Sequence, residues 1–303
     1  MDLRQLAALV AVADHGGFSA AADALHTVQS NVSSHIARLE RELGVTLVDR
    51  QAGRLTEEGA LVVARARRIS GELEGVVSDL AALHDEIVGA ARLGVIGTTS
   101  RWLVPRVLAK VRERHPRVRL VVVDATSTSL EPRLLAGELD LAVVNLPVPG
   151  RDLSCEPLFD EDLLLVVPAG HPLAARSRID MRDLEGVGLL LPPPGTAFRG
   201  ELDAAAAAAG ILLRPIAEVD GLRLIAGMAM EGQAPAIVPA TGVSGPSDHE
   251  LWKTLSVSGL PRRRVGVAQR RRGLPAAPTR AVLEVLREVV GAAEVKGLHP
   301  PTG

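Results

Sequence analysis

Apolar residues recur most regularly between residues 58 and 88. Their steps alternate between four and three residues, which gives a 3.5-residue repeat along one helical face. Such a seam is typical of a helix that packs lengthwise against another helix. The eight seam positions are Val62, Ala66, Ile69, Leu73, Val76, Leu80, Leu83 and Ile87. We therefore predict a linker helix over residues 59–89 that forms a homodimer, with packing of the helix on its own domain as the alternative.

Residues 1–58 contain short amphipathic stretches interrupted by glycine and polar residues. Gly16 ends the first stretch, Ser19 is placed to cap a second helix, and Thr27 is placed to cap a third. The apolar face of the third comprises Val32, Ile36, Leu39 and Leu43. Ser34 and Arg38 lie opposite that face, so two helices joined by a tight turn present polar groups outward, which predicts a helix-turn-helix. Residues 45–47 and 54–56, on either side of a turn at 51–53, predict a two-stranded wing.

Strands and helices alternate from residue 91 onward. The predicted strands cover residues 92–96, 119–123, 139–144, 163–167, 187–191 and 236–238. The predicted helices between them cover residues 102–115, 130–135, 200–209 and 222–230. This alternation predicts mainly parallel sheets in two α/β lobes. A small ligand would lie in the crevice between the lobes, beside strand C-termini and helix N-termini.

Composition and charge narrow the class of function. Of the 303 residues, 47% are hydrophobic, which is enough for more than one core. The net charge is −2, and residues 1–58 carry five arginines against eight acidic residues, so non-specific attraction to DNA should be weak. The single cysteine, Cys155, excludes an internal disulfide. No apolar run approaches the ~18 residues of a membrane span, and we expect a cytoplasmic protein with no membrane partner.

Several linked motifs resemble those of LysR-type transcriptional regulators. The motifs are FSAAADAL at 18–25, VQSNVSSHI at 28–36, LTEEG at 55–59, GELDLA at 137–142 and HPLA at 171–174. The resemblance covers nearly the whole chain and implies an α+β multidomain protein. It implies an N-terminal winged helix-turn-helix DNA-binding domain over 1–58, a linker/dimerisation helix over 59–89, and a C-terminal two-lobed α/β effector-binding domain over 90–303 that resembles periplasmic binding proteins. Lobe 1 would comprise about 90–161 and 268–303, and lobe 2 about 162–267.

The resemblance also implies a sequence-specific regulator of transcription. Its partners would be double-stranded DNA with inverted-repeat promoter sites, a small-molecule effector that acts allosterically, RNA polymerase, and further copies in a homodimer and a tetramer. The matching DNA-binding positions are Thr27, Gln29, Ser30, Ser33, Ser34, Arg38, Arg50 and Arg54. Gln29, Ser33 and Ser34 would read bases, and Arg50 and Arg54 would contact phosphates. Ser34 stands where the family often has arginine, so the DNA site should differ from the typical one.

Hydroxyl and amide side chains follow the predicted strands, where helix N-termini offer free N–H groups to an anion. The expected effector-binding residues are Thr98, Thr99, Ser100, Thr126, Ser127, Asn145, Thr196, Phe198 and Arg199. The resemblance places 195–199 at the cleft. Arg199 or Arg101 would pair with a carboxylate, and Trp102 or Phe198 would form an apolar wall. Each hydroxyl taken singly is better explained as a helix cap, but together they favour a pocket for a small organic anion.

The remaining motifs say less about function. No catalytic residue set, metal site or cofactor motif is evident, because the eight histidines lack ligand spacing and no nucleophile has a paired base. Arginine clusters at 262–264 and 270–272 flank an expected strand between the lobes, which favours solvated strand ends over a second nucleic-acid patch. The alternative function is a small-molecule-binding or enzymatic α/β protein whose N-terminal helices serve only assembly.

Overall fold

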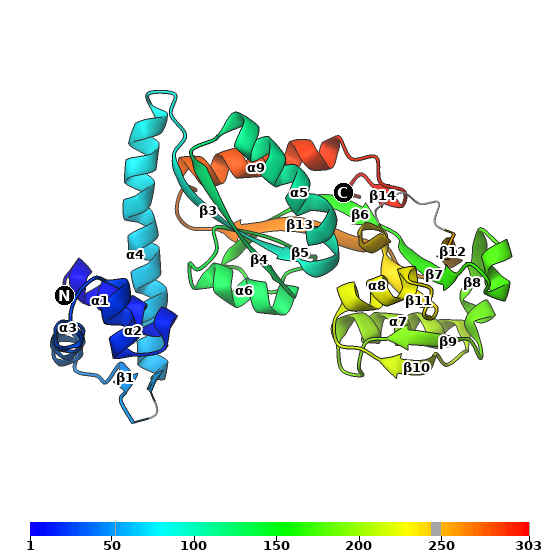
Figure 1. Cartoon of the computed structure of the whole chain (residues 1–303), viewed down its shortest axis with the longest axis horizontal. Helices are drawn as coiled ribbons and strands as arrows, with labels where there is room; N and C mark the ends of the chain where they lie inside the picture. The colour runs from blue at the N-terminus through cyan, green and yellow to red at the C-terminus, as the bar shows by residue number, and fades with distance from the viewer. Residues whose placement is uncertain (52, 244–249, 303) are drawn as a thin grey trace.

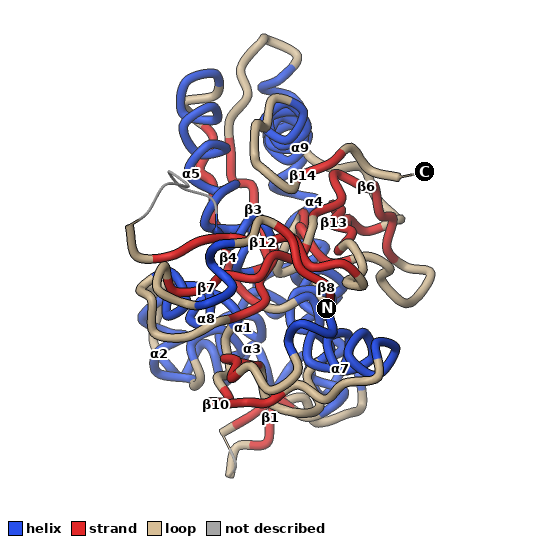
Figure 2. The backbone as a smooth tube through the Cα atoms, turned by 90° about the vertical axis from the view of Figure 1, so that its right-hand side faces the viewer, coloured by secondary structure: helices blue, strands red, loops and turns tan. Residues whose placement is uncertain are grey.

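A computed structural model describes residues 1–51, 53–243 and 250–302. Its parts lie in a row: an N-terminal helical domain, the long helix α4, and two α/β lobes (Figure 1). In Figure 2, helix α3 and strand β1 of the N-terminal domain lie toward the lower end of the molecule. Helices α5 and α9 of the first lobe lie toward its upper end. Within the described ranges, no helix is both long enough and apolar enough to cross a membrane.

The N-terminal domain packs three helices against the start of α4. Its elements are α1 (Leu3–His15), α2 (Phe18–Ala24), α3 (Gln29–Leu43), β1 (Val48–Asp49) and β2 (Arg54–Leu55). Helix α1 is capped by Asp2, whose carboxylate accepts from the backbone N–H of Gln5. The core joins Leu9 of α1, Ile36 of α3 and Val63 of α4, all fully or almost fully buried. Strands β1 and β2 pair antiparallel as a short wing.

Helix α4 spans Glu57–Ala82 and is capped by Thr56, whose hydroxyl accepts from the Gly59 N–H at 2.9 Å. The predicted helix over 59–89 therefore extends too far. The backbone turns through a positive φ at Asp85 and enters strand β3 at Gly89. Leu83 and Ile87 consequently lie outside the helix, and Ile87 packs against the core of the first lobe.

Lobe 1 contains one six-stranded sheet. Its elements are β3 (Gly89–Ile96), α5 (Gly97–Arg114), β4 (Val118–Ala125), α6 (Ser127–Leu135), β5 (Leu141–Asn145), β6 (Leu153–Glu161), β13 (Arg263–Arg270), α9 (Ala277–Gly291) and β14 (Leu298–His299). The strand order is β14-β6-β13-β5-β3-β4. Helices α5 and α9 cover one face of the sheet and α6 covers the other (Figure 1).

Lobe 2 contains the second six-stranded sheet, in the order β10-β9-β11-β7-β12-β8. Its elements are β7 (Leu163–Pro168), η1 (Pro172–Ala175), β8 (Arg178–Asp180), η2 (Met181–Leu184), β9 (Gly188–Leu191), α7 (Ala197–Ala209), β10 (Arg214–Glu218), α8 (Leu222–Met230), β11 (Ala236–Pro239), η3 (Ala240–Val243) and β12 (Trp252–Ser258). Along β7, Leu165 joins the core under α7, whereas Leu164 and Val166 join the core under α8. Because side chains alternate across a strand, this sheet is buried on both faces.

Two sequence expectations about the lobes are wrong. The sheets are mixed rather than mainly parallel, since β13 runs antiparallel to β5 and β6, and β7 runs antiparallel to β11 and β12. The second crossing between the lobes lies in residues 259–262, not at 267–268. The whole of β13 pairs within lobe 1, which moves residues 263–267 from the predicted lobe 2 into lobe 1.

Candidate functional site

Helix α3 has one buried and one exposed face. Val32 and Ile36 are fully buried, whereas Ser30, Ser34 and Arg38 are exposed. Ser33 is half-buried on the flank. A helix with exposed small polar groups and an arginine, fixed from behind by an apolar face, suits insertion into a DNA groove.

The turn before α3 differs from the expected cap. Val28 is the N-cap, without a side-chain hydrogen bond, and the Thr27 hydroxyl instead accepts from Asn31 Nδ2 at 2.9 Å. The prediction that Thr27 caps α3 is therefore wrong, because the helix begins one residue later than a Thr27 cap requires. Gln29 is exposed, and its side-chain oxygen accepts from the Ser19 hydroxyl of α2 at 3.2 Å.

The wing is held to α3 by one carboxylate. Glu40 Oε1 accepts from the backbone N–H groups of Leu47, at 2.8 Å, and Val48, at 3.2 Å. This contact fixes the first wing strand at Val48–Asp49 rather than at 45–47 as predicted. Arg50 lies 3.6 Å from Glu40 and 5.7 Å over the Phe18 ring. Arg54 is exposed on β2, and Ala52 of the expected turn lies outside the described residues.

The predicted seam divides into two parts along α4. Val62 and Ala66 pack into the core of the N-terminal domain. The remaining helical positions are exposed large apolar side chains: Ile69 (40%), Leu73 (47%), Val76 (57%) and Leu80 (58%). The opposite face, which contains Gly75, packs on lobe 1, where a Cβ at Gly75 would lie 3.5 Å from the Ala276 side chain.

The two lobes meet at the N-terminus of α5. Thr98 accepts from Arg263 Nη2 at 2.9 Å, and Arg263 also forms a buried ion pair with Glu161. The second oxygen of Glu161 accepts from the Thr241 N–H of lobe 2 at 3.0 Å. The expectation that arginines 262–264 are all solvated is therefore wrong for Arg263, which is 9% exposed. Its charge is tolerated there because Glu161 neutralises it.

A second contact between the lobes lies beside the Arg263–Glu161 ion pair. The Ser100 hydroxyl donates to Asp124 Oδ2 at 3.0 Å, and Arg223 of α8 forms an ion pair with the same carboxylate. Thr99 is fully buried, and its hydroxyl lacks a hydrogen-bond partner among the described residues.

The expected residues around α6 lie at the same edge of the sheet. The Ser127 hydroxyl accepts from the Asn145 backbone N–H at 3.0 Å. Asn145 Oδ1 is buried without a partner in the described part of the chain. Thr126 is exposed and exchanges hydrogen bonds with Thr128 and Ser129 at 3.0 and 3.1 Å. Strands β3 and β5 are parallel neighbours, so their C-terminal ends bring Thr99 and Asn145 to one edge.

In lobe 2 the expected residues have structural partners. Thr196 caps α7 by accepting from the Arg199 N–H. The Arg199 guanidinium lies 2.9 Å from Asp203 and 3.3 Å from Glu218. Its positive charge is thus matched within lobe 2, and Arg199 is not the free cation that the sequence suggested. Phe198 packs against the lobe 2 core.

The structure also places the two α5 residues that were expected at the cleft. Trp102 is 1% exposed and packs edge-on against Phe159 inside lobe 1, so it forms no pocket wall. Arg101 is exposed on α5. Asp124, Glu161, Arg223 and Arg263 were not expected at the cleft. Glu161 and Arg263 belong to strands 102 residues apart in the sequence, so no local pattern links them. Among the described residues, no group of three or more histidine, cysteine, aspartate or glutamate side chains could hold a metal ion.

Comparisons with known proteins identify both parts of the chain. A family model described as a bacterial regulatory helix-turn-helix protein of the lysR family matches residues 3–60, and the LysR substrate binding domain matches residues 84–291. The chain belongs to the LysR family of transcriptional regulators. It is a DNA-binding regulator and not an enzyme, so the alternative of an enzymatic or binding protein with helices used only for assembly is wrong. The predicted fold class is confirmed.

Relatives resemble this LysR regulator along their full length. A probable hydrogen peroxide-inducible genes activator of Streptomyces viridosporus is 32% identical over 293 residues, which cover 95% of this chain and 94% of that protein. A full-length OxyR variant from Pseudomonas aeruginosa has a TM-score of 0.78 and 25% identity, with 100% of this chain and 99% of that chain covered. CbnR complexed with its target DNA has a TM-score of 0.67 and 25% identity, with coverage of 95% and 99%.

Proposed function

We propose that this LysR regulator acts in the cytoplasm as a homodimer or tetramer on inverted-repeat promoter DNA, and that a small effector changes its contact with RNA polymerase. The observation that carries the proposal is the exposed polar face of α3, rigidly backed by the domain core. Sequencing of genomic fragments retained by the purified protein at near-physiological salt tests it. We expect a few intergenic fragments that share an imperfect inverted repeat; retention without any shared motif would contradict the proposal.

DNA contacts would divide between bases and phosphates. Gln29, Ser33 and Ser34 occupy the base-reading positions of α3, flanked by Thr27, Ser30 and Arg38, while Arg50 and Arg54 lie beside or on the wing. Gln29→Ala should change the preferred sequence, because a good base contact contributes about 1–3 kcal/mol of discrimination. Arg54→Glu should weaken binding to all sequences and make it less dependent on salt. Equal losses on every DNA for both variants would contradict this division.

Dimerisation would use the exposed part of the α4 seam. Leu73 and Val76 lie at its centre, and four apolar side chains in a row would otherwise remain in water. Leu73→Glu would place a charge in the centre of that interface, so we expect monomers in sedimentation experiments. Ser70→Glu, which puts the same charge beside the seam rather than in it, should weaken the dimer much less. A dimeric Leu73→Glu protein would refute this seam.

The effector would bind between the lobes at the N-terminus of α5, as a small organic anion. The 18-residue helix α5 directs its first free N–H groups toward this edge, where Thr99 and Asn145 carry buried polar atoms that have no partner among the described residues. Recognition would rest on α5, since Arg199 is already paired with Asp203 and Glu218. Calorimetry with a panel of small carboxylates and their neutral amides tests the charge preference, and binding by the amides alone would contradict it. Thr99→Val should lower the affinity for the anion about tenfold, which corresponds to the loss of one hydrogen bond.

Several relatives are named as activators of hydrogen peroxide-inducible genes, which raises thiol oxidation as the signal. In this chain only Cys155 carries a thiol, and no internal disulfide is possible. Partial desolvation on the strand surface raises the pKa of the exposed Cys155 thiol, and the nearby Glu131 carboxylate raises it further. A smaller thiolate fraction means slower oxidation. We therefore favour a non-covalent effector, and expect DNA binding by the wild type and Cys155→Ser to respond equally to peroxide. A response lost in Cys155→Ser would favour the thiol instead.

A further inference from the structure

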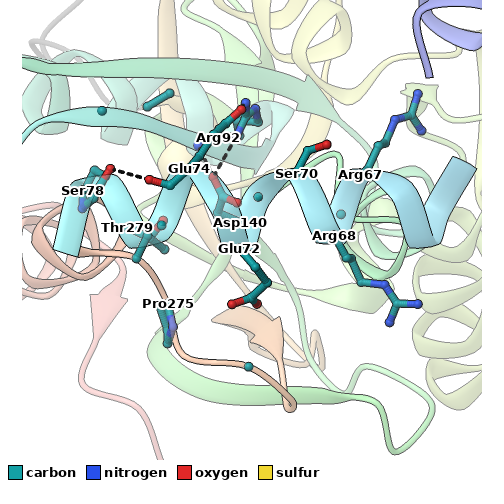
Figure 3. A pocket seen from close by; sticks show the side chains of 18 of the residues that line it. Arg67, Arg68, Ser70, Glu72, Glu74, Ser78, Arg92, Asp140, Pro275 and Thr279 are labelled. Carbon is teal, nitrogen blue, oxygen red and sulfur yellow. Dashed lines mark hydrogen bonds and ion pairs between the residues drawn. The ribbon is translucent and has the colours of Figure 1, made fainter. Parts of the chain in front are cut away.

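A groove of about 1080 Å³ runs between α4 and lobe 1 (Figure 3). Its walls are held together by polar contacts. Glu74 of α4 pairs with Arg92 of β3 at 3.1 Å. Asp79 Oδ1 accepts from the Ala277 N–H at the start of α9, at 2.9 Å, and from Arg280 at 3.2 Å. The linker helix is thus fastened to lobe 1 mainly by charges and hydrogen bonds.

At the end of the groove nearest the DNA-binding domain, one side chain of α4 contacts both of the domains on either side of that helix. Arg67 of α4 donates through Nη1 to Glu138 of lobe 1 and through Nη2 to Asp14 at the end of α1. The Arg67 side chain is only 18% exposed, against 46% for Asp14 and 28% for Glu138. Each Nη therefore serves a different domain, and the guanidinium keeps two carboxylates close together that would otherwise repel each other.

The backbone of lobe 1 touches α4 at the same place. Gly137 has a φ of +78°, and a Cβ there would lie 3.0 Å from Cγ of Arg68. The turn is itself rigid, since Arg133 donates to Glu138 at 2.9 Å and Arg270 donates to the carbonyls of Leu134 and Leu139 at 2.9 and 2.7 Å. Hydrogen bonds within lobe 1 therefore hold Glu138 opposite Arg67.

Helix α6 connects this turn to the cleft between the lobes. Ser127 begins α6 and accepts from Asn145 at the cleft, whereas Gly137 and Glu138 follow its C-terminal end. The nine residues of α6 span about 13 Å. A displacement of Ser127 would be carried along this short helix to the turn that holds Glu138.

We propose that Arg67 is a positioning residue that sets the orientation of the DNA-binding domain relative to lobe 1, and that α6 connects this contact to the effector cleft. The second part rests on the effector cleft proposed above. Loss of Arg67 releases both carboxylates at once and leaves α1 and lobe 1 joined only through α4 at this point. The helix-turn-helix itself is untouched, so its affinity for a single half-site should not change.

The single exposed cysteine offers a direct test. A donor dye on Cys155 of lobe 1 and an acceptor at the end of a duplex carrying the selected site report the distance between lobe 1 and bound DNA. With labelling sparse enough that each complex carries one donor, we expect narrow populations of energy transfer for the wild type, one for each position that the labelled copy occupies on the site. Arg67→Ala should raise at least fivefold the ratio of molecules whose energy transfer differs from that of the wild type to molecules with the wild-type value. Arg67→Lys keeps the charge but cannot bind two carboxylates through separate nitrogens, so its ratio should lie between those of the wild type and Arg67→Ala.

Controls separate positioning from folding. Arg114→Ala deletes an arginine that pairs with Glu288 inside lobe 1 and should leave the energy transfer unchanged. Affinity for a half-site duplex should stay within about twofold for Arg67→Ala. An Arg67→Ala protein that binds DNA with the wild-type distribution would overturn the proposal.

The connection through α6 has its own test in the same assay. Ser127→Ala should shift the population in the same direction, but add nothing in the Arg67→Ala background. A Ser127→Ala shift that persists at full size in that background would overturn the α6 connection. No effector is added, so these outcomes are independent of the proposed preference for anions.

Discussion

The ion pair of Arg263 and Glu161 should be one of the most sensitive points of the effector domain. Glu161 is fully buried, with one oxygen on Arg263 and the other on the Thr241 N–H. Arg263→Ala removes the cation and leaves a buried carboxylate with one backbone donor. Removal of one partner from a buried ion pair typically lowers the free energy of unfolding by about 3–5 kcal/mol. Replacement of both partners by apolar side chains of similar size costs far less, because no unpaired charge stays buried.

Thermal unfolding followed by circular dichroism measures this cost. For a unit of this size each kcal/mol lowers Tm by about 2–4 °C, so a loss of about 3 kcal/mol corresponds to about 6–12 °C. The double variant Glu161→Gln with Arg263→Met removes both charges at similar volume and should recover most of the loss. The reasoning is refuted if Arg263→Ala unfolds within about 2 °C of the wild type, or if the double variant is no more stable than the single one.

Three further outcomes follow from other contacts. Gly59→Ala should destabilise the N-terminal domain by about 1–3 kcal/mol or more, because the new Cβ would lie 2.0 Å from the Leu47 carbonyl oxygen. Denaturant unfolding of the full chain measures this loss, and an unchanged midpoint would contradict the prediction. Hydrogen bonds from Lys110 and Arg114 hold the pKa of Glu288 below its ordinary value of 4.5, so their stabilisation is present above that pH and is lost as pH falls through the lowered pKa. Tm measured between neutral and acidic pH should therefore fall less steeply for Glu288→Gln. Asp124→Asn removes the carboxylate that Ser100 and Arg223 share. Amide exchange at the start of α5 should become faster with little loss of Tm, since an exposed ion pair contributes only about 0.2–1 kcal/mol. An unchanged exchange rate would show that this bridge does not hold the lobes together.

Local periodicity explains what the sequence could predict. The apolar faces of α3 and α4 follow from spacings of three and four residues, so the helix-turn-helix and the exposed part of the seam were accessible without a structure. The end of α4 was not, because Leu83 and Ile87 continue the spacing although the chain turns at Asp85. A helical pattern cannot distinguish a seam residue such as Leu80 from Ile87, which a neighbouring lobe buries.

The cleft was predictable only in part. Thr98, Thr99, Ser100, Ser127 and Asn145 gather at the C-terminal edge of the lobe 1 sheet, as strand–helix alternation implies. Their charged partners come from elements far away in the chain. Arg223 reaches Asp124 across 99 residues, and Arg199 is matched by Glu218 on a strand that the sequence did not indicate. Strand pairing over such separations decides which charges remain available to a ligand, and local patterns do not record it.

The two faces of α4 differ in the physics of their contacts, and this leads to a last prediction. The seam carries Ile69, Leu73, Val76 and Leu80 without charges, whereas the face toward lobe 1 carries Arg67, Glu74 and Asp79 in ion pairs. Raising salt from about 0.1 to 1 M shortens the Debye length from about 10 to 3 Å, which weakens exposed ion pairs but not apolar burial. We therefore expect small-angle scattering at high salt to show dimers whose lobes are less tightly held to α4. Dissociation to compact monomers would mean that charges, not the seam, hold the copies together.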